Sequence, residues 1–171
     1  MEIPLKPDLS SEINNFQIIG PDLWRGGQPT VNAFTLLKDS GAKTIISLRE
    51  DQPALQKERE IVTALGMDYY AIPIRLFAVP DEEAIDYFLD IVSDKKNQPC
   101  FVHCLHGMDR TGLVVAIYRM QFHDWTFEQA HEELLKMGFH TEFQNLFQVF
   151  VAYGERITQN KQRVNKGPIA G

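Results

Sequence analysis

Two apolar segments joined by a short loop constrain the fold more than any other feature of the chain. Residues 99–103 form an apolar run that fits a buried strand, and residues 113–117 are apolar on nearly every side. A helix that is apolar all round has to be covered on every face. A buried strand followed by such a helix is typical of an α/β domain, in which helices cover a mostly parallel sheet.

The rest of the chain continues this alternation. Short apolar and β-branched runs predict strands at residues 16–24, 44–48, 67–74 and 99–103. Amphipathic segments predict helices that begin near Thr30, Pro53 and Asp81, and capping-box patterns predict two more helices, at Thr126 and Thr141. The expected fold class is α/β, with a central, mostly parallel sheet of four to five strands flanked by helices.

Length and charge set the expected organisation and limit the partners. The 171 residues predict a single domain over 16–160, with a polar N-terminal arm over 1–15 and a flexible tail over 161–171. The net charge of −6 disfavours binding to nucleic acid or to an anionic membrane. The sequence contains no run of about 20 apolar residues that would span a membrane. No signal peptide is visible, so we expect a cytoplasmic protein. We also expect a monomer.

The two cysteines, Cys100 and Cys104, are not expected to form a disulfide. Along an extended strand their Cα atoms would lie roughly 13 Å apart, which is beyond the reach of a disulfide. Free thiols indicate a reducing compartment.

The loop between the buried strand and the buried helix carries the chemistry. Its backbone N–H groups would form a concave nest at the helix N-terminus, where a tetrahedral oxyanion binds. Gly107 permits an unusual backbone angle, and Gly112 permits close packing of the helix. The same field would stabilise Cys104 as a thiolate. Arg110 offers a planar fork that matches two phosphate oxygens, so one loop supplies a nucleophile, an anion cradle and a charge clamp.

The pattern of this loop resembles a known signature. Five residues separate Cys104 from Arg110, His103 precedes the cysteine and Thr111 follows the arginine. This arrangement resembles the signature loop of the protein-tyrosine-phosphatase superfamily. The resemblance implies a tyrosine-phosphatase-like fold.

Two further segments narrow the resemblance. Residues 24–29 (Trp-Arg-Gly-Gly-Gln-Pro) and 44–49 (Thr-Ile-Ile-Ser-Leu-Arg) resemble the small atypical dual-specificity phosphatases. The tyrosine-phosphatase-like inositol phosphatases share this general layout. The likeness covers roughly residues 22–140.

The resemblance implies a metal-independent hydrolysis of phosphate monoesters in two steps, without a cofactor. Cys104 would attack phosphorus to form a phosphocysteine, which water then hydrolyses. Arg110 and the loop N–H groups would hold the phosphoryl oxygens, Thr111 would donate to the leaving thiolate, and His103 would orient the loop. The competing interpretation is a metal site at His103, Cys104 and His106. A structural zinc site needs four ligands, and the remaining histidines are isolated in the sequence.

Two aspartates are candidates for the general acid. Most dual-specificity members place this residue on a loop that corresponds here to residues 73–80, which contain no carboxylate. Asp81 follows that loop and precedes Glu82 and Glu83, as a helix N-cap does. Asp109 lies in a Gly-x-Asp-Arg-Thr sequence that resembles the loops of myotubularin-like lipid phosphatases and of some bacterial tyrosine phosphatases, in which the aspartate acts as the acid. We favour Asp109 and keep Asp81 as the alternative.

Substrate contacts are expected from the loop and from arginines near the ends of predicted strands. The loop positions are Leu105, His106, Gly107 and Met108, and the arginines are Arg25, Arg49 and Arg75. Ligands of α/β sheets bind at the carboxyl ends of the strands, so these arginines would ring the loop. Such a ring would suit a small polyphosphorylated substrate such as an inositol polyphosphate. The absence of lysine from the loop disfavours a membrane phosphoinositide.

Two other functions stay open on the sequence alone. In a protein-tyrosine or dual-specificity phosphatase, Leu76 and Phe77 would line a slot for an aromatic ring. An inactive phosphate-binding module is the second alternative, and the intact Cys104, Arg110 and Thr111 argue against it. The expected partners are therefore a phosphorylated small molecule or a phosphoprotein.

Overall fold

A single five-stranded sheet forms the centre of the protein. A computed structural model describes residues 8–167, and in them the strands are ordered β1-β2-β5-β3-β4. The strands are β1 (Gln17–Ile18), β2 (Leu23–Gly26), β3 (Thr44–Ser47), β4 (Asp68–Ala71) and β5 (Cys100–His103). β1 pairs with β2 in the antiparallel sense, and the other neighbours are parallel. The predicted α/β class and mostly parallel sheet are confirmed.

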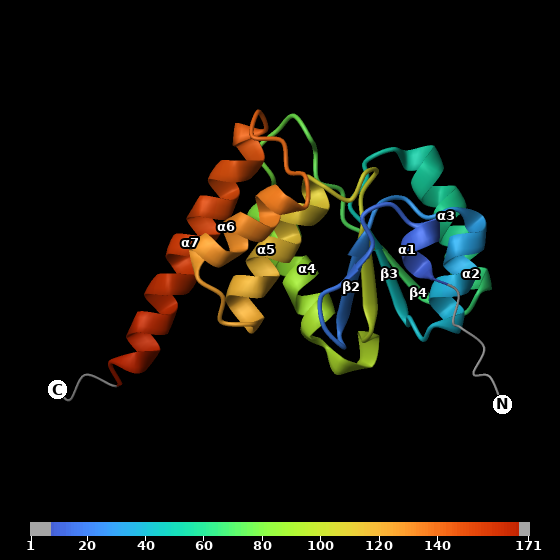
Figure 1. The fold of residues 1–171 in the computed structure, drawn as a ribbon. Coiled ribbons are helices and arrows are strands. Elements are labelled where there is room, and N and C mark those ends of the chain that lie inside the picture. The colour runs from blue at the N-terminus through green and yellow to red at the C-terminus, as the bar shows by residue number, and fades with distance from the viewer. Residues whose placement is uncertain (1–7, 168–171) are drawn as a thin grey trace.

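Helices cover both faces of this sheet (Figure 1). One face carries α1 (Leu9–Glu12), α2 (Val31–Asp39) and α3 (Gln52–Ala64). The other carries α4 (Glu82–Ser93), α5 (Arg110–Phe122), α6 (Phe127–Lys136) and α7 (Gln144–Asn165), and the 3₁₀ helix η1 (Lys95–Asn97) precedes β5. Among the described residues, no helix is long and apolar enough to cross a membrane.

The sheet separates two hydrophobic clusters because its side chains alternate between the faces. In β5, Phe101 packs with the residues of α1–α3, while Val102 packs with those of α4–α7. α5 lies between the sheet and the outer helices, and its residues 113–118 are all buried. The buried helix that the sequence predicts is therefore confirmed.

The domain is longer at both ends than the sequence suggests. Within the range expected to be a polar arm, α1 forms and buries Leu9 and Ile13 in the cluster with α2. Within the range expected to be a flexible tail, α7 continues to Asn165, and Lys161 Nζ donates to the Met120 carbonyl over 2.8 Å. A four-residue helix with one apolar position is too short to show a period. Residues 1–7 and 168–171 of these two predictions lie outside the described residues.

The start of α7 also differs from the prediction. The Thr126 capping box of α6 is present, but α7 begins at Gln144 without a side-chain cap, and Thr141 lies in the preceding turn. The backbone N–H of His140 donates to Asp109 Oδ1 over 2.7 Å. This long-range bond fixes the turn, and a local sequence pattern contains no sign of it.

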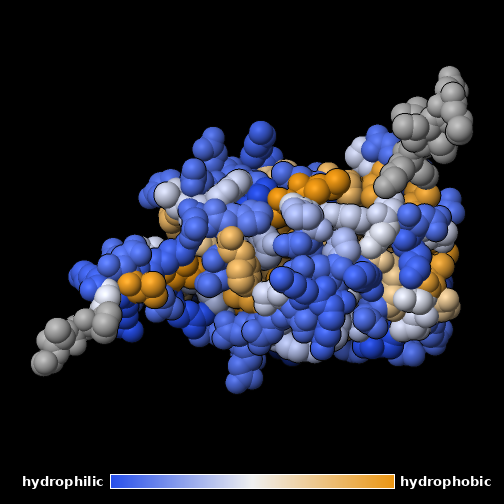
Figure 2. All heavy atoms as spheres, turned by 90° about the horizontal axis from the view of Figure 1, so that it is seen from below, coloured by the Kyte–Doolittle hydropathy of each residue, from blue (hydrophilic) through white to orange (hydrophobic). Residues whose placement is uncertain are grey.

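The register brings four chain segments to one edge of the sheet. His103, at the end of β5, pairs with Gly26 of β2 and with Ser47 of β3, and Ser47 pairs with Ala71 of β4. The loops that follow these strands meet at their carboxyl ends, which lie at the top of Figure 1. The opposite end of the molecule is covered largely by hydrophilic residues (Figure 2).

Candidate active site

The loop from Cys104 to Asp109 joins β5 to α5 and folds around the Cys104 thiol. Cys104 is 3% exposed, and the backbone N–H of Gly107 donates to its Sγ over 3.2 Å. Leu105 and His106 are exposed to solvent, while Gly107 is buried. The sulfur therefore lies inside the loop, within reach of a backbone N–H donor.

Three successive carbonyl groups of the loop are bound from behind by the N-terminal part of the domain. The Leu105 carbonyl accepts from Gln28 N over 3.0 Å, the His106 carbonyl from Asn15 Nδ2 over 2.8 Å, and the Gly107 carbonyl from Arg25 Nη2 over 2.8 Å. In a trans peptide the C=O and the following N–H point in opposite directions. Fixing these carbonyls therefore directs the next N–H groups to the concave side of the loop, where an oxyanion would sit.

Gly107 is required where the loop meets the segment after β2. Its φ is +74°, in the left-handed region, and an added Cβ would lie 2.6 Å from Gly26 C and from Gly27 N. Gly112, the third residue of α5, lets this helix pack closely on α6, because a Cβ there would lie 2.8 Å from Leu134 Cδ1. The roles that the sequence predicts for both glycines are confirmed.

Arg25 lies beneath the loop and not at its rim, so the predicted substrate contact of Arg25 is wrong. It is 1% exposed, and it pairs in the sheet with Val102, whose side chain packs beneath α5. Burial lowers the pKa of Arg25 to about 10, although Glu133 and Cys104 act on this pKa in the opposite direction and raise it. A residue within a strand points to a face of the sheet and not to its edge. The Arg25 guanidinium therefore lies inside the domain and supports the loop from there.

Arg110 and Thr111 form the first turn of α5. The Gly112 and Leu113 N–H groups of this turn donate to the Met108 and Asp109 carbonyls over 3.1 and 2.9 Å, and the N-terminus of the helix has no side-chain cap. An uncapped helix N-terminus favours the binding of an anion. Arg110 is 8% exposed, and Thr111 is fully buried. The Thr111 Oγ1 has no hydrogen-bond partner among the described residues, so this hydroxyl is available to donate.

A buried contact between His103 and Glu58 lies behind the nucleophile. His103 is fully buried, with Nδ1 3.1 Å from the Cys104 carbonyl and Nε2 2.7 Å from Glu58 Oε1. Glu58 of α3 also accepts from the Tyr69 hydroxyl over 2.7 Å and from Gln28 Nε2 over 3.1 Å. Burial alone would raise the pKa of Glu58, but His103, Tyr69 and Gln28 outweigh it and hold the pKa below its ordinary value.

Glu58 is not among the site residues that the sequence predicts, although the sequence contains a signal for it. Leu55, Glu58 and Val62 form the buried face of α3, at spacings of three and four residues. An acidic residue on the apolar stripe of an amphipathic helix needs a buried partner. Only the sheet pairing of β3 with β5 reveals that this partner is His103.

The two candidate acids have different surroundings. Asp81 is exposed and caps α4, with its carboxylate accepting the Glu83 N–H over 3.2 Å, so its interpretation as a helix cap is confirmed. Asp109 is 8% exposed and precedes Arg110, and its carboxylate contacts His140 in the turn between α6 and α7. His140 is therefore a neighbour of the site that the sequence did not indicate.

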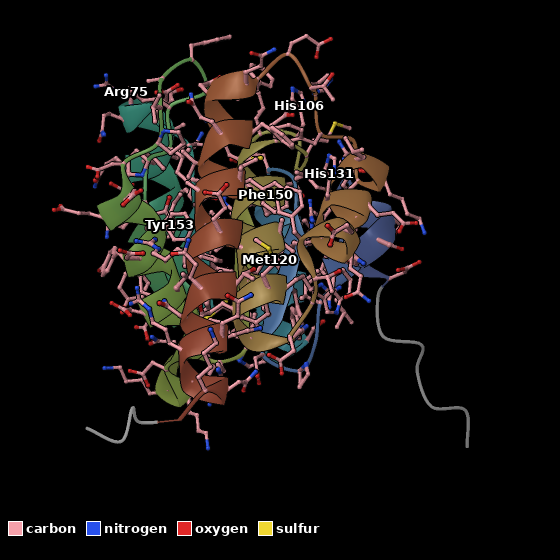
Figure 3. All side chains as sticks on the ribbon, turned by 90° about the vertical axis from the view of Figure 1, so that its left-hand side faces the viewer. Arg75, His106, Met120, His131, Phe150 and Tyr153 are labelled. Atoms are coloured by element: carbon pink, nitrogen blue, oxygen red, sulfur yellow. The ribbon has the colours of Figure 1, made fainter. Side chains whose placement is uncertain are left out.

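The remaining predicted arginines lie on loops at the carboxyl edge of the sheet. Arg49 follows β3 and donates from Nη1 to Gln28 Oε1 over 2.8 Å. Arg75 is exposed and makes no ion pair with any described residue. Figure 3 shows Arg75 and His106, which belongs to the loop between β5 and α5, at the same end of the molecule. We call this loop, from Cys104 to Asp109, the phosphate loop. Phe77, close to Arg75 in the chain, is 85% exposed.

The arrangement of the possible metal ligands bears on the competing interpretation, in which the loop is a metal site. No group of three or more His, Cys, Asp or Glu side chains within residues 8–167 is arranged to hold a metal ion. Cys100 is fully buried at the start of β5, and burial raises the pKa of its thiol to about 12.

Comparisons with known proteins agree with this geometry. The family model described as a DSP-PTPase phosphatase fused to NAD⁺ kinase matches residues 10–149. The dual specificity protein phosphatase TpbA of Pseudomonas aeruginosa is 27% identical over 128 residues, which are 75% of this chain and 56% of TpbA. The inositol diphosphatase DSP3 of Arabidopsis thaliana is 25% identical over 134 residues, which are 75% of this chain and 64% of DSP3. The chain thus spans little more than half the length of TpbA.

A solved structure shares the architecture. The crystal structure of a putative phosphatase from Shewanella putrefaciens superposes with a TM-score of 0.68 at 27% identity, covering 85% of this chain and 97% of the other. The family match includes the sheet, the loop from Cys104 to Arg110 and the helix behind it. The chain belongs to the DSP-PTPase phosphatase family, within the atypical dual-specificity part of the protein-tyrosine-phosphatase superfamily.

Proposed function

We propose that the protein is a metal-independent, cysteine-dependent phosphomonoester hydrolase. The observation that carries this proposal is the Cys104 thiol, held inside the loop with the Gly107 N–H 3.2 Å from its Sγ and with Arg110 opening the helix behind it. A nucleophile, N–H donors and a guanidinium converge where one phosphoryl group would sit.

The reaction proceeds in two steps. The Cys104 thiolate attacks phosphorus in line, the bond from phosphorus to the ester oxygen breaks, and the leaving alcohol takes a proton from the general acid, assigned to Asp109. Water then attacks the phosphocysteine and gives its proton to the Asp109 carboxylate, the phosphorus–sulfur bond breaks, and the thiolate leaves as inorganic phosphate forms. The unpartnered Thr111 hydroxyl stabilises this departing thiolate.

We infer that the substrate is a small molecule with more than one phosphate, such as an inositol polyphosphate. The unpaired, exposed Arg75 and the Arg49 side chain after β3 supply positive charge beyond the reacting phosphate, on a chain whose net charge is −6. The similarity to DSP3, an inositol diphosphatase, supports the same class of substrate.

A phosphotyrosine substrate is the second candidate. Phe77 is 85% exposed, and its ring centroid lies 5.8 Å from that of Phe143, so an aromatic surface stands beside Arg75. An aryl phosphate would stack on such a surface. The name of TpbA, a dual specificity protein phosphatase, supports this candidate.

Phosphate release from a panel of inositol phosphates and phosphotyrosine peptides tests the proposal, with the Cys104→Ser variant as the matched control. We expect turnover by the wild-type protein in EDTA and none by the variant, because a hydroxyl is a far weaker nucleophile at neutral pH. Oxyanion binding without turnover in the wild-type protein would identify an inactive phosphate-binding module. Loss of activity in EDTA that one divalent metal restores would support the metal interpretation.

A further inference from the structure

We propose that Asn145 is a positioning residue that holds the segment after β4, residues 75–79, in place at the carboxyl edge of the sheet and thereby determines substrate selectivity. This inference rests on the proposed function, because the segment carries Arg75 and Phe77, the contacts proposed there for the part of the substrate beyond the reacting phosphate. Asn145 is the second residue of α7, and its contacts with the segment cross 67 and 69 residues of the chain.

Both N–H groups of one side-chain amide bind the segment. Asn145 Nδ2 donates to the Leu76 carbonyl over 2.8 Å and to the Ala78 carbonyl over 2.7 Å. A primary amide has two N–H donors, and backbone carbonyls only accept, so the NH₂ group and not the amide oxygen must face this segment. The two carbonyls flank Phe77 in the chain, so binding both of them fixes the backbone that presents the Phe77 ring.

The segment has no other hydrogen bond to hold it. Regular pairing ends where the Ile74 N–H donates to the Leu48 carbonyl, and it begins again at Asp81, the cap of α4. Within residues 8–167, the two bonds from Asn145 are the only hydrogen bonds that involve residues 75–79. A segment without hydrogen bonds of its own opens easily unless contacts with the rest of the chain hold it. Asn145 supplies the polar part of those contacts.

The same junction of α6 and α7 also contacts the end of the phosphate loop. The Phe77 ring centroid lies 5.8 Å from that of Phe143, which lies 6.1 Å from the His140 ring centroid. The His140 backbone N–H donates to Asp109 Oδ1 over 2.7 Å. A single stretch of six residues, 140–145, therefore binds the segment on one side and the phosphate loop on the other.

This arrangement affects selectivity because the two side chains of the segment are open to a ligand. Phe77 is 85% exposed, and Arg75 is exposed without an ion pair to any described residue. A mobile segment would have to be ordered when a substrate binds, and that ordering costs conformational entropy. Holding the segment in advance favours substrates that reach it over small substrates that contact only the phosphate loop.

The Asn145→Leu variant tests whether the amide holds the segment. Leucine has a similar size, has no donor and adds no charge. Chymotrypsin cleavage after Phe77, followed by mass spectrometry of the fragments, should become about tenfold faster or more, because proteolysis follows the population of the open segment. Asn160→Leu is the matched control, since Asn160 is an exposed residue of the same helix, and its cleavage rate should equal that of the wild-type protein.

Asn145→Asp is a second variant, which decides the question if the leucine variant does not fold. Aspartate keeps the shape and lacks both donors, and its negative charge is favourable in the first turn of a helix, so α7 should be retained. Cleavage after Phe77 should be accelerated here as well. An unchanged cleavage rate in either folded variant would overturn the proposal.

Steady-state kinetics test the consequence for selectivity. Asn145→Leu should raise KM for inositol hexakisphosphate by about three- to tenfold and KM for para-nitrophenyl phosphate less. When Arg75→Ala and Phe77→Ala are already present, Asn145→Leu should add little, because the side chains that it positions are gone. An equal rise in KM with and without these two side chains would show that Asn145 acts in some other way and would overturn its role in selectivity.

The cleavage experiment needs no substrate, so its outcome is independent of phosphate release. Accelerated cleavage of the variants of a protein that releases no phosphate would refute the proposed function and leave the role of Asn145 in holding the segment in place. Phosphate release with unchanged cleavage would do the reverse.

Discussion

The Asp109 carboxylate is bound twice by His140. Its Oδ1 accepts the His140 backbone N–H over 2.7 Å, and its Oδ2 lies 3.0 Å from the imidazole Nδ1. This pair connects the end of the phosphate loop to the turn between α6 and α7. His140 therefore fixes the position of the carboxyl group that we propose as the general acid.

Replacing Asp109 should have an effect that depends on the leaving group. An alkyl or inositol alkoxide needs a proton to depart, whereas para-nitrophenolate does not. Asp109→Asn should therefore slow turnover of an alkyl phosphate by about 10²–10⁴-fold and that of para-nitrophenyl phosphate less. Steady-state kinetics with both substrates across pH should also show a flattened alkaline limb in the variant.

Asp81→Asn is the control for this experiment. Asparagine caps helices about as well as aspartate, so both substrates should be turned over at near wild-type rates. If Asp81→Asn shows the leaving-group dependence and Asp109→Asn does not, the acid is Asp81.

The two cysteines should differ in reactivity. Burial raises the pKa of Cys100 to about 12, so this thiol is protonated and shielded at neutral pH. Iodoacetamide at pH 7.5 should therefore add one group to the folded protein, located at Cys104 by peptide mass spectrometry. The Cys104→Ser variant should add none, and rapid labelling of Cys100 would contradict the structure.

Two glycine substitutions separate backbone strain from steric overlap. Gly41 and Gly107 both have positive φ, but a Cβ on Gly41 meets nothing within 4 Å, while one on Gly107 meets the backbone after β2. Gly41→Ala should lower the free energy of unfolding by roughly 1–2 kcal/mol and leave phosphate binding intact. Gly107→Ala should in addition weaken phosphate binding, as measured by calorimetry. Equal binding by both variants would show that the loop tolerates displacement.

Arg75→Ala should distinguish between the two substrate classes. Loss of an exposed arginine that contacts a remote phosphate should raise KM for a polyphosphorylated substrate. It should leave KM for an aryl monophosphate nearly unchanged. Arg49→Ala should do the same, because Arg49 also follows a strand at the carboxyl edge of the sheet. Equal changes for both substrates would favour the phosphotyrosine candidate.

The depressed pKa of Glu58 predicts how stability depends on pH. The unfolded chain binds a proton at this residue near its ordinary value of about 4.3, and the folded chain binds it at lower pH. The stabilisation is therefore complete above about pH 4.3 and is lost as the pH falls through the folded-state pKa. Thermal unfolding from pH 6 to pH 3 should show a steeper fall in Tm for the wild-type protein than for Glu58→Gln.

Local patterns were sufficient to predict most of the fold. The Thr30 cap, the positive φ of Gly41 and the buried strands depend on neighbours in the sequence, and each is present. The phosphate loop was also identifiable, because a strand, a glycine-containing turn and a helix that are consecutive in sequence form the anion site together.

Long-range contacts were not predictable from such patterns. Asn15 binds the His106 carbonyl across 91 residues, so the first residues of the domain looked like an arm. The direction of Arg25 depends on which face of β2 it occupies, and that face is fixed only by the pairing with β5. In the sequence, Glu58 looks like one of many charged residues on an exposed helix. Its contact with His103 depends on the pairing of distant strands, which the sequence does not reveal.

β5 is synthesised after β2, β3 and β4, yet it lies between β2 and β3. Until residues 100–103 leave the ribosome, the sheet consists of two separate pairs of strands, and a two-stranded unit is marginally stable at best. The strand that joins these halves also carries the reactive thiol at its end. A nascent chain therefore completes its sheet and acquires its nucleophile in the same event, and a chain that ends before β5 has neither.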